Sequence, residues 1–175
     1  HSSKHKIKNA KVTNIWTQSK EESKKIADLS FIPNIEDNYL DLIDKVDAIL
    51  LARDDFENHY KFSFPFLKSG MPIYIDKPIA NKISSLNKIF DNQKYKGQIF
   101  TCSAMRYAKE FNLSHQEINS FGEIFKIIAT APKDWPRYSI HIIEPVLNMF
   151  NLYKEYETEK VINLGENGLQ VNLKF

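Results

Sequence analysis

The sequence predicts an α/β fold, and three consecutive segments carry the prediction. Residues 46–52 (VDAILLA) are almost continuously apolar, as in a strand that is buried on both faces of a parallel sheet. Residues 56–67 place apolar side chains at helical spacings of three and four, namely Phe56, Tyr60, Phe64 and Leu67. Residues 71–75 (MPIYI) are a second apolar segment. Strand, helix and strand in this order predict a right-handed βαβ unit.

Polar residues follow both predicted strands of this unit. Arg53 and Asp54 come after the first strand, and Asp76, Lys77 and Pro78 come after the second. Ligands of open α/β sheets bind beyond the carboxyl ends of the parallel strands. We therefore expect a ligand site at this edge of the sheet.

The neighbouring segments continue the alternation of strands and helices. Residues 11–17 predict a strand. Ser19 is a good N-cap for a helix that runs to about Asp28, with Glu21 and Glu22 in its first turn. Further expected elements are a short helix over 38–45, a left-handed helix cap at Gly70, a helix over 81–92 that buries Ile83, Leu86, Ile89 and Phe90, and a strand over 98–103.

Composition excludes several classes of function. The 24 basic and 22 acidic residues give a net charge of +2, which provides no electrostatic footprint for nucleic acid or a membrane surface. Cys102 is the only cysteine, so an intrachain disulfide and a thiolate metal cluster are excluded, and a reducing cytoplasm is the simplest location. No apolar segment has the length of a membrane span, and no signal peptide is visible.

The residues of the βαβ unit resemble those of the Gfo/Idh/MocA oxidoreductases. In that family a strand ends in Ala-Thr-Pro, a His opens the next helix, a Gly-Lys turn follows, and a second strand ends in Glu-Lys-Pro. The matching positions here are Leu51-Ala52-Arg53, His59, Ser69-Gly70 and Asp76-Lys77-Pro78. The resemblance implies an NAD(P)-dependent dehydrogenase of sugars or cyclitols. It also implies a Rossmann-type parallel sheet followed by an α+β domain with a mostly antiparallel sheet.

The resemblance also guides the interpretation of the second half. Arg106-Tyr107 resembles the start of a family helix, which is expected here to end near Ser120, and the alternating residues 124–130 resemble the first strand of the antiparallel sheet. Later expected elements are a loop over 132–136, a helix over 139–150, and strands over 161–163 and 169–175. We expect a nucleotide-binding domain over 1–103 and a substrate domain over 104–175.

One family signature is missing from the 175 residues, the Gly-x-Gly-x-x-Gly phosphate loop. The five glycines are Gly70, Gly97, Gly122, Gly165 and Gly168. The family places this loop before the strand at 11–17, close to residue 1, and places further sheet strands after residue 175. Either the loop has been lost or it lies outside this sequence. Without its backbone amides and helix N-terminus, a pyrophosphate loses its main anchor.

Lys77 and His141 are the candidates for catalysis. An ammonium at a strand end can hydrogen-bond a reacting hydroxyl and steady a nicotinamide, although a lysine in an ordinary surface turn is the alternative. The resemblance implies that His141 assists proton removal from the substrate hydroxyl, with Glu144 on the same helical face. The alternative for His141 is a satisfied helix histidine. Cyclitol dehydrogenases carry an Asp at the position of Arg137, so an acidic or differently oriented substrate is expected.

The resemblance places the cofactor over the strand ends. NAD-specific relatives carry an Asp at the position of Thr17, so NAD and NADP both stay open. The expected cofactor-binding residues are Thr17, Ser19, Ala52, Arg53, Asp54, His59, Asp76, Lys77 and Pro78, and His59 is interpreted as structural rather than catalytic. The expected substrate-binding residues are Arg106, Tyr107, Trp135, Arg137 and Tyr138, although aromatic residues are more often part of a core. His5 and His115 have no metal-ligand spacing, so no metal site is expected.

Two hypotheses about function follow. The first is an NAD(P)-dependent oxidoreductase that transfers a hydride to or from a sugar, a cyclitol or a related carbohydrate-like substrate, and that forms a homo-oligomer through the second-domain sheet. The second is a non-catalytic relative of the same fold, which binds a sugar or nucleotide or acts as an assembly subunit. The missing glycine loop and Arg137 favour the second hypothesis.

Overall fold

The computed structural model describes residues 8–151, 157–165 and 168–174. Its strands are β1 (Asn14–Ile15), β2 (Asn34–Ile35), β3 (Ile49–Leu51), β4 (Ile73–Ile75), β5 (Ile99–Phe100), β6 (Glu157–Asn163) and β7 (Leu169–Lys174). Its α-helices are α1 (Lys20–Ser30), α2 (His59–Ser69), α3 (Ile83–Phe90), α4 (His115–Ser120), α5 (Trp135–Tyr138) and α6 (Ile140–Met149). Short 3₁₀ turns are η2 (Tyr39–Leu42), η3 (Phe56–Asn58), η4 (Ala104–Tyr107) and η5 (Lys109–Phe111).

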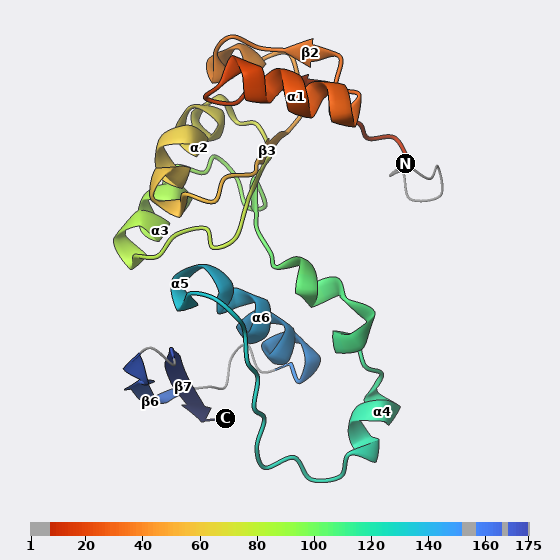
Figure 1. Cartoon of the computed structure of the whole chain (residues 1–175), viewed down its shortest axis with the longest axis vertical. Coiled ribbons are helices and arrows are strands. Elements are labelled where there is room, and N and C mark those ends of the chain that lie inside the picture. Colours follow the sequence, from red (N-terminus) through yellow and green to blue (C-terminus); the bar gives the residue numbers. More distant parts are fainter. Residues whose placement is uncertain (1–7, 152–156, 166–167, 175) are drawn as a thin grey trace.

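The first half forms parallel strands that are covered by helices, at the upper end of the molecule in Figure 1. Strands β3, β4 and β5 pair in parallel, with Ile49 opposite Ile73 and Leu51 opposite Ile75. Helix α2 connects β3 to β4, so the expected parallel βαβ unit is confirmed. Strands β1 and β2 form a separate parallel pair. Trp16 joins this pair to the main core, because its ring packs 5.7 Å from the ring of Phe62 on α2.

The core lies between α2, α3 and the three-stranded sheet. Its most buried members are at most 2% exposed: Phe66, Leu67, Ile73, Ile75 and Ile89. Burying an aliphatic or phenyl side chain of this size stabilises the fold by roughly 1.5–3 kcal/mol. This cluster therefore holds β3 and β4 rigidly enough to present the residues that follow them.

The predicted buried face of α2 is partly wrong. Phe56 and Leu67 are buried as expected, but Phe64 is 37% exposed, and Phe62 and Phe66 take its place against the sheet. The helical period was counted from Phe56, which lies in the 3₁₀ turn η3, where the rotation per residue differs from that of an α-helix. Helix α3 shows a similar departure, since only Ile89 is buried and Ile83 is 75% exposed.

The predicted helix ends in the first half are largely confirmed. Ser19 caps α1 by accepting a hydrogen bond from the Glu22 amide. Gly70 ends α2 with a φ of 88°, and its N–H donates to the Phe66 carbonyl at 3.1 Å. A residue with a Cβ is strained at such a φ, which is why a glycine stands there. The expected helix over 38–45 is the shorter 3₁₀ turn η2, and the expected strand over 11–17 is reduced to Asn14–Ile15.

Two expectations for the second half are wrong. Residues 124–130 form no strand, and Phe125 and Ile128 are 96% and 76% exposed. Alternating residues become a strand only when another strand takes up their backbone hydrogen bonds, and no described segment does so here. The single helix expected up to Ser120 is divided into η4, η5 and α4. Asn112 donates to the carbonyls of Arg106 and Ala108, and Ser114 starts α4 with a capping box.

The remaining elements agree with the expected α+β character. Helix α6 matches the helix expected over 139–150, and α5 precedes it at an N-capping Asp134. Strands β6 and β7 form an antiparallel hairpin with Val161 opposite Val171, so the two expected strands are confirmed, while Phe175 lies outside the described residues. None of the helices in residues 8–151, 157–165 and 168–174 combines the length and the hydrophobicity of a membrane span.

Candidate functional site

The candidate site lies at the carboxyl ends of β3 and β4. The pairing of Leu51 with Ile75 puts these ends side by side, and the Asp76 amide donates to the Leu51 carbonyl at 3.0 Å. The residues that follow the two strands, 53–55 and 76–78, therefore share one edge of the sheet. This edge faces the second half of the chain.

Lys77 connects the two halves. Its side chain is only 18% exposed, and its Nζ lies 3.6 Å from the carboxylate of Asp76. The same Nζ lies 5.7 Å from the centre of the Tyr138 ring, which belongs to α5. The ammonium is therefore directed from the end of β4 toward α5, and not into an ordinary surface turn.

His141 stands on α6 beside this cluster. Its ring centre lies 5.9 Å from that of Tyr138, and its Nδ1 lies 2.7 Å from the Oγ of Ser103, which follows β5 and is completely buried. Lys77, Tyr138 and His141 thus form one continuous group, drawn from the end of β4 and from α5 and α6.

Glu144 supports His141 indirectly. Its carboxylate accepts the Ser103 N–H at 2.5 Å and the Arg106 guanidinium at 3.2 Å, and it is only 12% exposed. Ser103 therefore stands between the two residues that the sequence placed on one helical face. Sequence reasoning did not identify Ser103, because its partner His141 is 38 residues away and no local pattern joins them.

The surroundings of His141 favour its neutral ring. Partial burial lowers its pKa below the ordinary value, and the nearby Lys77 ammonium lowers it further. The carboxylates of Asp76 and Glu144 oppose these effects without reversing them. A neutral imidazole offers one N–H donor and one acceptor nitrogen, so its tautomer decides which of them faces the cluster.

Two more cations belong to the segment around Tyr138, and the described contacts of Lys133 reach Tyr138 itself. Lys133, which the sequence analysis did not single out, donates to the Tyr138 hydroxyl at 3.1 Å and lies 4.7 Å from its ring centre. The Arg137 guanidinium lies 5.6 Å from the centre of the Phe56 ring and 3.5 Å from Asp134. The surroundings of Tyr138 are therefore cationic.

The other expected substrate residues lie at different distances from this group. Arg106 reaches Glu144 and so belongs to the support of His141. Tyr107 is 60% exposed and contacts the Arg106 guanidinium, with 5.9 Å from its ring centre to Cζ. Trp135 opens α5 and is half-buried, and no described hydrogen bond or ring contact links it to Lys77 or His141.

Thr17 and Ser19 form the turn between β1 and α1. The Thr17 hydroxyl donates to the Ser19 carbonyl at 2.6 Å, and the Thr17 amide donates to Ser23 Oγ at 2.9 Å. The Ser19 hydroxyl caps α1. The turn carries hydroxyls and no carboxylate at Thr17.

Arg53 joins this turn to the end of β3. Its guanidinium binds both oxygens of Asp55, contacts Gln18 at 3.3 Å and stacks 4.2 Å above the Phe62 ring. The bidentate ion pair lowers the pKa of Asp55 to about 2. Ala52 and Asp54, beside this pair, are exposed.

His59 is completely buried beneath the same edge. Its two ring nitrogens lie 3.0 Å from the Arg53 carbonyl and 3.1 Å from the Ile79 carbonyl. The ring thus ties the loop after β3 to the loop after β4. This geometry agrees with the interpretation of His59 as structural.

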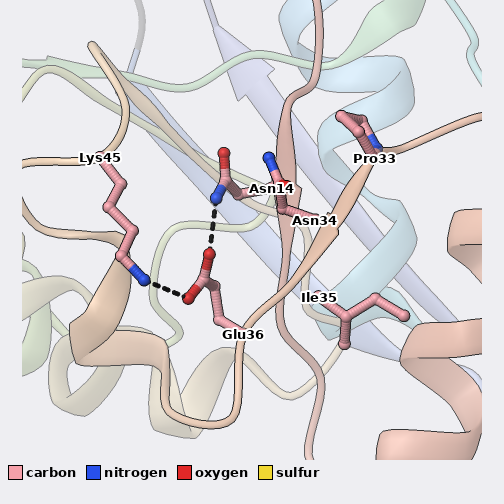
Figure 2. A pocket seen from close by; sticks show the side chains of 6 residues that line it. All are labelled: Asn14, Pro33, Asn34, Ile35, Glu36 and Lys45. Atoms are coloured by element: carbon pink, nitrogen blue, oxygen red, sulfur yellow. Dashed lines mark hydrogen bonds and ion pairs between the residues drawn. The ribbon is translucent and has the colours of Figure 1, made fainter.

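An open cavity of about 550 Å³ lies elsewhere, beside β1 and β2 (Figure 2). Glu36 lies within it and accepts hydrogen bonds from Lys45 and Asn14, each at 2.6 Å, which lower the pKa of its carboxyl. Each carboxylate oxygen of Glu36 thus accepts a hydrogen bond from a residue of its own cavity, and none of the residues that line the cavity belongs to the Lys77–His141 group. The candidate site is therefore the Lys77–His141 group at the strand ends.

A family model described as an oxidoreductase family with an NAD-binding Rossmann fold, Gfo/Idh/MocA, matches residues 1–103. The chain belongs to the Gfo/Idh/MocA oxidoreductase family. The expected family, fold class and nicotinamide dinucleotide cofactor are confirmed at this level, while the choice between NAD and NADP stays a prediction. No curated protein matches the chain in sequence.

Solved structures show the same fold at low sequence identity. A myo-inositol 2-dehydrogenase from Lactobacillus plantarum superposes with a TM-score of 0.65 at 14% identity, covering 97% of this chain and 60% of its own. An apo scyllo-inositol dehydrogenase from Lactobacillus casei gives 0.64 at 15% identity, covering 97% and 59%. A levoglucosan dehydrogenase in complex with NADH and levoglucosan gives 0.51 at 18% identity, covering 64% and 32%. The chain thus spans three fifths or less of these proteins.

Proposed function

We propose that this family member is an NAD(P)-dependent oxidoreductase that transfers a hydride to or from a carbohydrate-like alcohol or carbonyl. The observation that carries the proposal is the convergence of Lys77 and His141 on Tyr138. The two residues are 64 positions apart in sequence, yet Nζ and the imidazole centre lie 5.7 and 5.9 Å from the same ring centre. The solved inositol and levoglucosan dehydrogenases support the substrate class by analogy.

The residues of the chain fit the nicotinamide and ribose ends of such a cofactor. Hydroxyls at Thr17 and Ser19 and the Arg53 guanidinium lie at the ends of β1 and β3, and Lys77 lies at the end of β4. Without a carboxylate at Thr17 and with Arg53 close by, this edge tolerates the 2′-phosphate of NADP as well as the hydroxyl of NAD. The 175 residues offer no glycine loop for the pyrophosphate.

The chemistry at the substrate carbon is supplied by the bound cofactor, which accepts or gives the hydride. The protein acts on the substrate oxygen. An ammonium N–H of Lys77 hydrogen-bonds this oxygen and stabilises the charge that develops on it, and His141 holds it from the α6 side. The ring of Tyr138 and the Lys133 ammonium beside it line the substrate side, and Arg137 of the same helix contacts Phe56 and Asp134. This arrangement suits a substrate that carries a negative group.

The wider assignments follow from this proposal. Residues 1–103 form the nucleotide-binding domain, and residues 104–175 belong to the substrate domain. The protein works in the cytoplasm as a homo-oligomer that associates through the second-domain sheet. Light scattering of the purified protein tests the oligomer.

A non-catalytic relative that binds a sugar or nucleotide is the second candidate, favoured by the absent glycine loop. Titration with NADH and NADPH, followed by fluorescence, is the first step, and it separates the enzyme from a relative that binds only a sugar; a relative that binds nucleotide is separated by turnover in the second step. Binding of either nucleotide supports the enzyme, and failure of both to bind at millimolar concentration contradicts it.

Substitution of Lys77 gives the second step. The substrate is a sugar, cyclitol or sugar acid that the wild-type protein turns over. Lys77→Ala is expected to lower this turnover by about 10²–10⁴-fold, because proton transfer and charge stabilisation are lost, while NADH still binds. Lys82→Ala removes an exposed lysine of the same loop and should leave turnover unchanged. Equal turnover in Lys77→Ala and the wild type would contradict the assigned role.

A further inference from the structure

The hydrogen bonds around Ser103 determine which nitrogen of His141 carries the proton. The Ser103 hydroxyl can accept two hydrogen bonds and donate one. It already accepts the Met105 N–H at 3.2 Å, and its only other described partner is His141 Nδ1 at 2.7 Å. Ser103 is completely buried, so a hydroxyl proton that is not donated there would be left unsatisfied, which is unfavourable.

The position of Ser103 is itself fixed. The Ser103 N–H donates to Glu144, and the second oxygen of that carboxylate accepts the Arg106 guanidinium. Glu144 lies one turn after His141 on α6 and holds the backbone of Ser103. With the backbone held, rotation of the Ser103 hydroxyl would break its hydrogen bond with His141 Nδ1. The carboxylate therefore positions His141 through this serine, in addition to its electrostatic effect on the pKa of the ring.

We propose that Ser103 is a positioning residue that donates its hydroxyl proton to His141 Nδ1 and so holds the neutral imidazole with its proton on Nε2. In this tautomer His141 presents an N–H donor, not a free base nitrogen, on the ring atom that does not face Ser103. The lowered pKa of His141, which favours the neutral ring, is consistent with this state.

A division of labour follows, and this part depends on the proposed function. In carbonyl reduction, the hydride forms the new C–H bond and the C=O π pair moves onto oxygen. That oxygen takes a proton from the Lys77 ammonium, which becomes a neutral amine, while His141 Nε2–H donates a hydrogen bond and stays neutral. In the reverse direction the Lys77 amine takes the hydroxyl proton. Lys77 is thus the proton carrier, and His141 is a fixed hydrogen-bond donor, because its other nitrogen already accepts from Ser103.

Nitrogen NMR of ¹⁵N-histidine-labelled protein tests the tautomer without any need for activity. His141→Asn identifies the signals of His141 among those of the five histidines. At pH 7.5 we expect a protonated-type shift at Nε2 and an unprotonated-type shift at Nδ1. A protonated-type shift at Nδ1, or averaged shifts for both nitrogens, would overturn the proposal.

Variants of Ser103 test the cause. Ser103→Ala is expected to average the two shifts of His141, and Ser103→Thr, which keeps the hydroxyl, should restore the wild-type pattern. Ser114→Ala is the matched control, because it also removes an N-capping hydroxyl but lies on α4. An unchanged tautomer in Ser103→Ala would overturn the role of the serine. If Ser103→Ala does not fold, the NMR measurement on the wild-type protein still tests the tautomer of His141.

Turnover tests the division of labour separately. Loss of one hydrogen-bond donor to a developing oxyanion lowers kcat by about 10²–10³-fold, so this loss is expected for His141→Ala. His141→Gln keeps an N–H donor but has no basic nitrogen, and it should recover at least tenfold over the alanine variant. Equal loss in both variants would overturn the donor role. If the wild-type protein binds no nucleotide, the proposed function is contradicted. The role of Ser103 is still decided by the NMR measurement, which does not depend on nucleotide binding.

Discussion

At the scale of single residues, the strand-end edge is organised by groups that bond to one another. Arg53 binds both oxygens of Asp55, and His59 lies between the carbonyls of Arg53 and Ile79. These contacts leave Lys77 as the cation of this edge that points toward α5. The fixed geometry around Lys77 is therefore a product of several side chains that do not meet the substrate themselves.

The Arg53–Asp55 ion pair predicts a pH-dependent effect on stability. Asp55→Asn is expected to lower the free energy of unfolding by roughly 1 kcal/mol at pH 7, a small value because the Asp55 side chain is 41% exposed. Since folding lowers the pKa of Asp55 to about 2, this contribution is complete above the ordinary value of 3.8 and is lost as the pH falls through 2. Urea unfolding at pH 7 and at pH 2 measures it.

The neighbouring carboxylate provides the control for this prediction. Asp54→Asn changes an exposed acid one position away, and it should leave the free energy of unfolding within about 0.5 kcal/mol of the wild type. If Asp55→Asn is as stable as Asp54→Asn at pH 7, the ion pair contributes nothing measurable.

At the scale of elements, one buried polar side chain joins the turns that flank the central sheet. Gln98, immediately before β5, is 1% exposed. Its amide donates to the carbonyls of Leu67 and Met71 at 3.0 and 3.1 Å, and its oxygen accepts the Lys94 amide at 2.6 Å. The end of α2, the start of β4 and the turn before β5 are therefore held by one residue.

Gln98→Leu is expected to lower the free energy of unfolding by about 2–4 kcal/mol, because it leaves the Met71 carbonyl and the Lys94 amide without this partner and removes one of the two hydrogen bonds to the Leu67 carbonyl. Chemical denaturation followed by circular dichroism measures the change. Gln93→Leu, at a half-buried glutamine of the same turn whose side chain makes none of these bonds, should cost much less. A similar loss in both variants would contradict the role of Gln98.

At the scale of the whole molecule, α6 packs against η4, the turn that follows β5 and leads from the parallel sheet into the second half of the chain (Figure 1). The bonds from Glu144 to Ser103 and Arg106 fasten this contact. By contrast, the apolar side chains of 121–128 stay on the surface, with Phe125 96% exposed. An exposed apolar segment of this kind is typical of a surface that another segment or subunit covers.

Glu144→Gln is expected to loosen the contact between the halves at a cost of about 1.5–3 kcal/mol, since a charge-assisted acceptor is replaced by a neutral amide. The two tryptophans lie on opposite sides of the contact, Trp16 beside the core and Trp135 on α5. In variants that keep only one of the two tryptophans, Glu144→Gln should therefore lower the unfolding midpoint reported by Trp135 fluorescence more than the midpoint reported by Trp16 fluorescence. Glu123→Gln, at an exposed acid, is the control, and an equal midpoint in both substitutions would refute the prediction.

Features that are encoded within a few residues could be predicted from the sequence. Local hydrogen bonds, backbone sterics and apolar periodicity account for the Ser19 cap, the turn at Gly70, the βαβ unit and the strand-end position of Lys77. Only the folded chain shows which face of α2 is buried, that residues 124–130 pair with no described strand, and that Ser103 contacts His141, which is 38 residues away. These outcomes depend on which distant segment lies opposite, and a local pattern carries no information about that.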